Sequence, residues 1–275
     1  MRKAKDNVIK TILYLSAFIT VAIVAVIIGY VFKKGIGLIS LDFIFGDYSA
    51  STGGGVFPMV ITTVLTVLVS LVIAVPIGIG GAVFLSEYAR QGRFVRIVRY
   101  AIDTLAGIPS IIYGLFGSVF FVTAMNLGFS VIAGSLTLAI IVLPVIISTT
   151  EESLKAVPQS YREAAVALGS TKFELLYKIV LPAALPGILS GVILSMGRII
   201  GESAALILTL GTVASMPNSI MSSGRTLTIH SYLAAKESGD IQLASATGIV
   251  LIVMILILNL TAKALSSRIV NKRLK

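Results

Sequence analysis

Long apolar stretches separated by short polar connections dominate the pattern of this chain. Six stretches reach about the 20 residues that a helix needs to cross the hydrocarbon of a bilayer. They cover residues 8–32, 57–85, 97–125, 129–149, 183–210 and 241–265. Backbone groups in lipid must be hydrogen-bonded within the chain, so each stretch is predicted to be a helix. The pattern therefore predicts an all-α, polytopic membrane protein with six transmembrane helices.

Basic side chains are divided unevenly between the two sets of connections. If the N-terminus lies in the cytoplasm, the inner segments hold 17 of the 22 lysines and arginines, and the outer segments hold Lys33, Lys34, Arg225 and Lys236. The remaining one, Arg198, lies within a span. Cytoplasmic loops carry an excess of basic residues, so both termini are predicted to be cytoplasmic. This bias accounts for the net charge of +10 without a nucleic-acid partner.

The composition supports a bilayer as the solvent of this chain. Only 12% of the residues are charged and 56% are hydrophobic, whereas soluble domains carry about 25% charged residues. The chain has no cysteine, which excludes disulfides and thiol catalysis. Its one histidine, His230, has no second histidine or cysteine with which to bind a metal, and we expect it in a loop. Neither a metal site nor a cofactor is predicted.

Three regions follow from these spans. Residues 1–56 hold the first transmembrane helix and an external loop. The apolar part of this helix is too long for a signal peptide. Residues 57–266 form the core, and residues 267–275 form a basic cytoplasmic tail. A second external loop, 211–240, is either a docking surface or a simple connector.

A short amphipathic module, residues 151–182, lies between the fourth and fifth spans. Pro158 favours a helix start, with Ser160 as N-cap and Glu163 as its capping-box partner. Gly169 then ends this helix in a left-handed conformation. Thr171 or Ser170 caps a second helix, 172–180, which is predicted to stop at Pro182.

The first helix of this module has a surface that suits a protein groove. Ala164 and Ala165 are small and allow close approach, and Leu168 follows one turn later. Arg162 and Glu163 are expected to fix the orientation at the edge of this surface. The alternative is an amphipathic hairpin that lies on lipid. The chain has no G-x-x-x-x-G-K-[ST] phosphate loop, so any ATPase must be another polypeptide.

The fifth span carries two charges, although a charge at mid-membrane costs about 2.5–3.5 kcal/mol on insertion scales. Arg198 and Glu202 are four residues apart, so on a helix they share a face and can pair. The arginine fork suits tetrahedral oxyanions, which makes Arg198 a candidate for anion sensing and Glu202 its positioning partner. The alternative is an ion pair that only locks helices. A similar local pair, Arg99 with Asp103, is expected in the third span.

Small residues flank these charges in two G-x-x-x-G pairs, which permit close helix packing. The predicted packing residues are Gly187, Gly191, Gly197 and Gly201. The third span is interrupted by Gly107 and Pro109, and such a broken helix can present backbone N–H groups to an anion.

Several segments resemble the permease subunits of bacterial phosphate-specific ABC importers, the PstA type in particular. The cytoplasmic module has the spacing of importer coupling loops: E-A-A, three residues, G, nine residues, I-x-L-P. Many importer permeases share this loop, so it indicates the transport mechanism but not the substrate. More specific segments are GGGVFPMVITTVL (53–65), LSEYA (85–89), AIDTLAGIPSIIYGLFG (101–117), LPAALPGILSGVI (181–193) and GRIIGES (197–203). The resemblance covers most of the chain from Gly54 onward.

This resemblance implies a type-1 importer permease fold in a bacterial inner membrane. It implies a second, homologous permease as partner, two cytoplasmic ATPase copies, and an external phosphate-binding protein. The family's Arg and Glu of phosphate passage fall on Arg198 and Glu202. Ser203 follows where the family has Thr, and Ala205 stands where the family has Pro. This departure leaves the shape of the helix after Glu202 open.

The sequence leaves one close alternative and disfavours two other classes of function. One arginine does not distinguish phosphate from sulfate or molybdate, so the same machine for another oxyanion stays open. A secondary transporter would show inverted repeats and intramembrane acids for ion coupling. A membrane-embedded enzyme would need convergent nucleophile, base or metal groups, which the sequence lacks. The chain is therefore expected to be a non-catalytic transport subunit.

Overall fold

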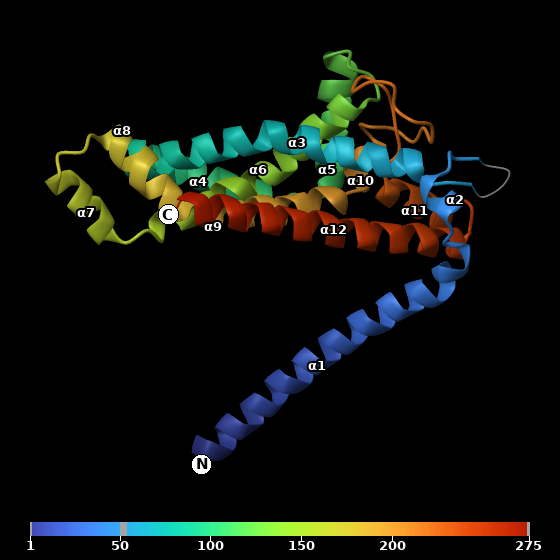
Figure 1. Ribbon diagram of the computed structural model, residues 1–275, viewed down its shortest axis with the longest axis horizontal. Coiled ribbons are helices and arrows are strands. Elements are labelled where there is room, and N and C mark those ends of the chain that lie inside the picture. The colour runs from blue at the N-terminus through green and yellow to red at the C-terminus, as the bar shows by residue number, and fades with distance from the viewer. Residues whose placement is uncertain (1, 50–53, 274–275) are drawn as a thin grey trace.

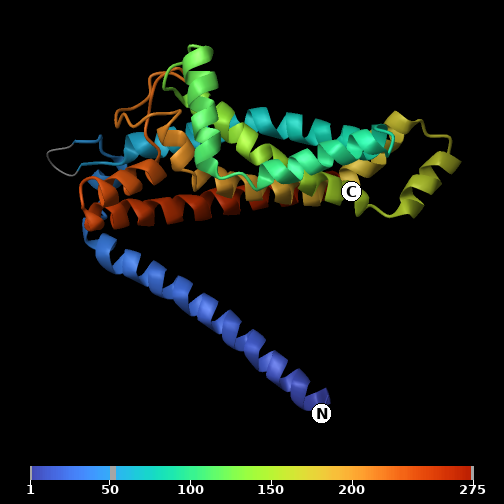
Figure 2. The ribbon, with the colours of Figure 1, turned by 180° about the vertical axis from the view of Figure 1, so that it is seen from behind.

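The computed structural model describes residues 2–49 and 54–273, and the regular structure of this part is entirely helical. Four long helices lie side by side along the molecule, as Figures 1 and 2 show: α3 (Phe57–Val83), α6 (Val131–Lys155), α9 (Leu181–Ile200) and α12 (Ile241–Arg273). Large apolar side chains such as Leu138, Ile141 and Ile199 are fully buried between them. Because lipid tails are as apolar as these side chains, close van der Waals packing between the helices holds the bundle together.

The first helix, α1 (Arg2–Gly35), leaves this bundle and diverges from it along its length (Figure 1). It joins the bundle at Gly35, where a Cβ would lie 2.5 Å from the backbone of Ser245 and Ala246. The apolar stretch of α1 has a mean hydropathy of 2.7, and none of its most apolar part is buried against the rest of the chain. This helix therefore offers apolar surface on all sides.

The predicted third span is not one straight helix. It consists of α4 (Arg93–Ala106), α5 (Ser110–Gly117) and the π-helical η3 (Ser118–Ala124), with a bend of 100° between α4 and α5. Pro109 is extended, with ψ at 137°, because a proline and the residue before it disfavour continued helix. Among the described residues, five helices are long and apolar enough to cross a membrane, and the count is six if the bent pair forms one span.

The predicted fifth span, 183–210, is wrong at both ends. Helical structure runs from α8 (Lys172–Glu174) through the π-helical η4 (Leu175–Val180) into α9 and stops at Ile200. The second helix of the cytoplasmic module therefore does not stop at Pro182, because this proline lies in the first turn of α9, where it is tolerated. After α9 the chain forms a short helix, α10 (Ala204–Ile207).

The two ends of the bundle are covered by different elements. At one end, α7 (Gln159–Ala167) projects beyond the bundle on the side of the C-terminal end of α12 (Figure 1). At the opposite end lie η1 (Ile36–Leu38), α2 (Leu41–Phe45) and α11 (Leu227–Lys236). The α7 end gathers Arg99, Lys155 and Arg162, so it is the cytoplasmic end by the distribution of positive charge.

His230 is not in a loop, because it lies in α11 and is only 2% exposed.

Candidate functional site

The start of α7 differs from the predicted cap. Pro158 itself occupies the N-cap position, and no side chain caps the first turn. Ser160 consequently lies inside the helix, so the predicted capping box between Ser160 and Glu163 does not form. The carboxylate of Glu163 is left on an exposed position of α7.

The turn after α7 has the predicted glycine conformation. Gly169 has a φ of +80°, in the left-handed region that glycine adopts without a Cβ clash. Its N–H donates to the Val166 carbonyl at 2.9 Å, and the Ser170 N–H donates to the Ala165 carbonyl at 3.1 Å, which is the paired pattern of a Schellman C-cap. Thr171 then caps the next helix in a reciprocal capping box with Glu174. The elbow therefore has a fixed geometry.

Arg162 anchors α7 to the body of the protein. Its Nη1 lies 2.8 Å from Oε2 of Glu87, and its Nη2 donates to the Leu154 carbonyl at 3.0 Å. Glu87 belongs to the π-helical η2 (Phe84–Tyr88), which continues α3. The structure thus turns Arg162 toward the bundle, not toward the edge of a docking surface as the sequence suggested. Ala165 is buried on the same side.

The opposite side of α7 is open. Leu168 is 86% exposed, and Ala164 and Glu163 are exposed beside it. Tyr161, which also borders a hollow along α9, and Val166 are exposed on the flanks of this helix. The described chain therefore leaves a small apolar face on α7, with one carboxylate at its border, uncovered.

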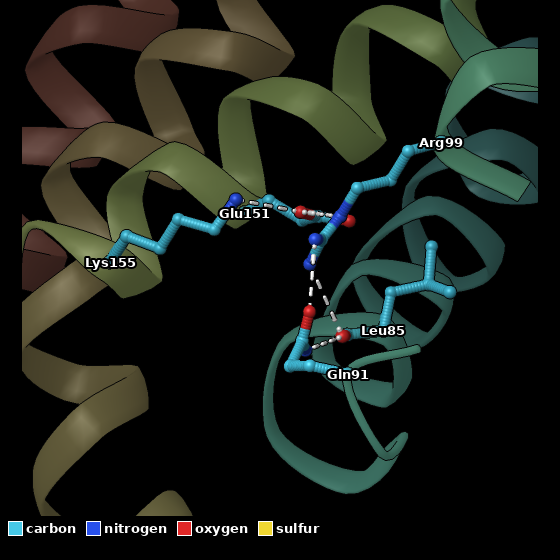
Figure 3. A network of polar contacts seen from close by, with 5 residues as sticks. All are labelled: Leu85, Gln91, Arg99, Glu151 and Lys155. Carbon is cyan, nitrogen blue, oxygen red and sulfur yellow. Dashed lines mark hydrogen bonds and ion pairs between the residues drawn. The ribbon is translucent and has the colours of Figure 1, made fainter. Parts of the chain in front are cut away.

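A second polar network lies next to this anchor at the cytoplasmic end (Figure 3). Arg99 of α4 places Nε 3.0 Å from Oε2 of Glu151, and Nη1 donates to Oε1 of Gln91 at 3.1 Å. The Nζ of Lys155 shares the same Glu151 oxygen at 3.0 Å. The predicted local pair of Arg99 with Asp103 is wrong, since Arg99 reaches across to α6 and Asp103 stays exposed. Glu151 is almost completely buried, and the charges of Arg99 and Lys155 compensate the charge of its carboxylate.

Inside the membrane region, Arg198 and Glu202 are not paired. Helix α9 ends at Ile200, so the four-residue spacing no longer places both side chains on one helical face. The Glu202 Oε1 instead accepts a hydrogen bond from the Ala205 N–H at 3.2 Å. Ser203 occupies the N-cap position of α10, but its side chain makes no capping hydrogen bond. Across residues 2–49 and 54–273, Arg198 forms no ion pair or hydrogen bond with another side chain or carbonyl.

Two of the four predicted packing glycines lie against another helix. A Cβ on Gly187 would lie 2.9 Å from Cβ of Ser153, and a Cβ on Gly191 would lie 2.8 Å from Cβ of Thr149. These contacts join α9 to α6. Gly197 has no neighbour within 4 Å of such a Cβ, and Gly201 has only carbonyls of its own helix end, so the second G-x-x-x-G pair packs against no other described helix.

Arg198 lines a cavity of about 540 Å³ on the surface of α9. The cavity wall consists of Val145, Ile193, Leu194, Gly197, Arg198 and Asn259. A second cavity of about 670 Å³ begins at the same Leu194 and continues past Gly191 and Gly187 to Tyr161 of α7. The two hollows therefore form a succession along α9, from the intramembrane arginine to the cytoplasmic module. The sequence did not predict a role for Asn259, because a single amide within a long apolar run is a weak signal.

No group of three histidine, aspartate or glutamate side chains in the described ranges comes together as a metal site. The cavity beside α9 offers one cation, Arg198, one amide, Asn259, and an apolar wall.

Comparisons with known proteins identify the family of this chain. Residues 74–271 match the family model described as binding-protein-dependent transport system inner membrane component. The probable ABC transporter permease protein YqgI of Bacillus subtilis (strain 168) is 31% identical over 288 residues, covering 98% of each chain. The phosphate transport system permease protein PstA of Pasteurella multocida (strain Pm70) is 32% identical over 275 residues, covering 95% of this chain and 94% of that protein.

Solved structures share the fold at lower identity. A chain of a bacterial ABC transporter involved in the import of the polysaccharide alginate superimposes with a TM-score of 0.70 at 17% identity, over 98% of this chain and 99% of that one. A chain of the MetNI methionine ABC transporter, in an inward-facing conformation, gives a TM-score of 0.60 at 19% identity, over 80% of this chain and 94% of that one. With the family match over most of its length, the chain belongs to the inner-membrane components of binding-protein-dependent transport systems, as a multi-pass ABC permease of the PstA type.

Proposed function

We propose that this chain is the permease subunit of an ATP-driven phosphate importer and forms half of its translocation pathway. The observation that carries the proposal is Arg198, which lines an intramembrane cavity and has no ion pair or hydrogen bond within the described part of the chain. A guanidinium is always protonated and offers a fork that matches tetrahedral oxyanions. A relative of similar length is named as a phosphate transport system permease protein, and this supports phosphate as the anion.

The energy for transport comes from a separate cytoplasmic ATPase, and this chain is not itself an enzyme. The sequence contains no phosphate-binding loop of the Walker type. The uncovered apolar face of α7, with Ala164 and Leu168 at its centre, is the surface for a groove on that ATPase. Movement of α7 reaches α3 through Arg162 and Glu87, and it reaches α9 through the elbow at Gly169.

The complete importer needs further subunits. A homologous permease completes the pathway, and the divergent α1, which buries none of its most apolar part against its own chain, supplies apolar surface for that partner. An external phosphate-binding protein delivers the ion to the end of the bundle that carries α2 and α11. Closure of the ATPases pushes the α7 helices together and opens the pathway outward, and ATP hydrolysis resets it.

Substitution of Arg198 tests the proposal. In the assembled importer, Arg198→Lys, Arg198→Gln and Arg198→Ala should each abolish uptake of labelled phosphate, while the subunits still assemble. Arg93→Gln, which removes an exposed arginine on α4, is the matched control and should leave uptake unchanged. Normal uptake in all three Arg198 variants would exclude this arginine from the pathway. Competition by arsenate, sulfate and molybdate measures which oxyanion the pathway accepts.

A further inference from the structure

Asn259 of α12 is a polar side chain in an unusual position. Its neighbours in sequence are Leu258 and Leu260, within the apolar run of a membrane-spanning helix. Its Oδ1 is buried and has no hydrogen-bond partner, and its Nδ2 donates to no residue of the described chain. A carbonyl oxygen that is buried without a hydrogen bond is unfavourable, so a group outside this chain is the expected partner of the amide.

The position of Asn259 indicates what that group is. Asn259 and Arg198 line the same cavity, one from α12 and the other from α9. The remaining wall, formed by Val145, Ile193, Leu194 and Gly197, is apolar. A cation and an amide, neither of which has a hydrogen-bond or ion-pair partner among the described residues, therefore border one apolar hollow. An intramembrane ionisable residue of this kind marks a substrate path, and in this hollow the amide is the second polar group.

An oxyanion satisfies both groups at once. The guanidinium fork of Arg198 donates to two oxygens of a tetrahedral anion. The Asn259 amide has two donors and one acceptor, and the terminal torsion of asparagine has two broad orientations. It can therefore donate to a third oxygen of the anion, or accept from a protonated one. An uncharged amide adds a directional contact without a second fixed charge that would hold the anion permanently.

We propose that Asn259 is a substrate-binding residue that completes, with Arg198, an oxyanion site between α9 and α12. This inference rests on the proposed function, because it assigns a second ligand to the anion in the same pathway. The bound anion would bridge α9 and α12, between which the described residues form no side-chain hydrogen bond or ion pair. Its passage would therefore loosen or tighten the α9–α12 contact.

Protection of a single cysteine tests this site without relying on transport. The chain has no cysteine, so Leu194→Cys, at a 63% exposed position in the cavity wall, gives one reactive thiol in the assembled importer. Inorganic phosphate should slow its alkylation by a maleimide. Adding Asn259→Leu, which has similar size and no polar atom, should raise the phosphate concentration needed for equal protection by about tenfold or more.

Controls separate a site from a general effect. Leu256→Cys lies on α12 at a 55% exposed position outside this cavity, and phosphate should not change its alkylation. Asn259→Ala replaces the leucine variant if that variant does not assemble, with the same expected loss of protection. Unchanged protection and unchanged phosphate uptake in the Asn259 variant would overturn the inference while leaving the proposed function intact. Absence of any ATP-dependent phosphate uptake by the wild-type importer would instead remove the proposed function itself.

Discussion

Arg162 of α7 and Glu87 at the end of α3 form an ion pair of 2.8 Å across 75 residues of sequence. Their side chains are only 18% and 14% exposed, respectively. The pair joins the helix with the uncovered apolar face to a helix of the membrane bundle. The contact is therefore placed to transmit displacement of α7 into the membrane region.

Removal of this pair should uncouple the importer. Arg162→Gln leaves a mostly buried Glu87 without its cation, and we expect it to cost about 1–3 kcal/mol of local stability. The amount of phosphate transported per ATP hydrolysed should fall, although ATP hydrolysis continues. Measurement of both rates in the same proteoliposomes gives this ratio. The charge-reversed double variant Glu87→Arg with Arg162→Glu should recover part of it, and an unchanged ratio in the single variant would argue against the pair as a link.

The buried carboxylate of Glu151 gives a second prediction. Glu151→Gln removes the charge that Arg99 and Lys155 share (Figure 3), so two cations lose their partner at the cytoplasmic end. We expect the free energy of unfolding to fall by about 1–3 kcal/mol. Thermal unfolding in detergent measures the loss. Glu152→Gln, at the exposed neighbouring position, is the matched control, and equal effects of both variants would contradict the importance of the network.

Close packing of α9 on α6 predicts different costs for similar glycines. Alanine at Gly187 or Gly191 would collide with Ser153 or Thr149, and overpacking of this kind costs about 1–3 kcal/mol. Gly197→Ala meets no atom within 4 Å, so the better helix propensity of alanine should leave the stability unchanged or slightly higher. The melting temperatures of the three variants, compared in one detergent, test this order. A Gly197 variant as unstable as the other two would refute the assignment of the packing face.

Acidification should destabilise the end of the bundle that carries α11. Burial, followed by the nearby Arg225 charge, lowers the pKa of His230 from 6.5 to about 4, so the folded protein holds this imidazole neutral. The unfolded chain binds its proton near pH 6.5, and stability is therefore complete above that pH and decreases as the pH falls toward 4. The expected loss is about 2 kcal/mol at pH 5. Hydrogen exchange of α11 at pH 7.5 and pH 5 measures it.

The histidine variant provides the control for this pH dependence. His230→Gln keeps a polar side chain of comparable size but does not titrate. The difference in α11 protection between pH 7.5 and pH 5 should therefore shrink in this variant. The contacts that Arg225 and Tyr48 make with the imidazole ring are lost at both pH values and do not contribute to this difference. A difference of the same size in the variant would show that another group causes it.

Uninterrupted apolar runs made the bundle predictable. Helices α3, α6 and α12 begin within two residues of their predicted starts, because each begins where its apolar run begins. In the structure Pro58 lies in the first turn of α3, and Ser130 caps α6. The third and fifth spans were predicted less well. Apolar content continues through Gly107–Pro109 and past Gly201, so hydropathy alone did not reveal the 100° bend or the end of α9.

The candidate site was predictable where the signal was local. The left-handed Gly169 and the Thr171 cap depend on neighbouring residues and have the expected geometry. The partners of Arg162 and Arg99 are 75 and 52 residues away, a separation that leaves no spacing pattern in the sequence. The expected pairing of Arg198 with Glu202 assumed a helix that continues past Ile200. Asn259 shares a cavity with Arg198 only because α12 folds back beside α9.

The most direct test measures uptake of labelled phosphate into proteoliposomes that contain both permeases, with and without the ATPase. An ATP-driven importer should accumulate phosphate only when the binding protein, ATP and the ATPase are all present. Vanadate should abolish this accumulation. Accumulation of phosphate by the permeases in the absence of the ATPase would contradict this mechanism.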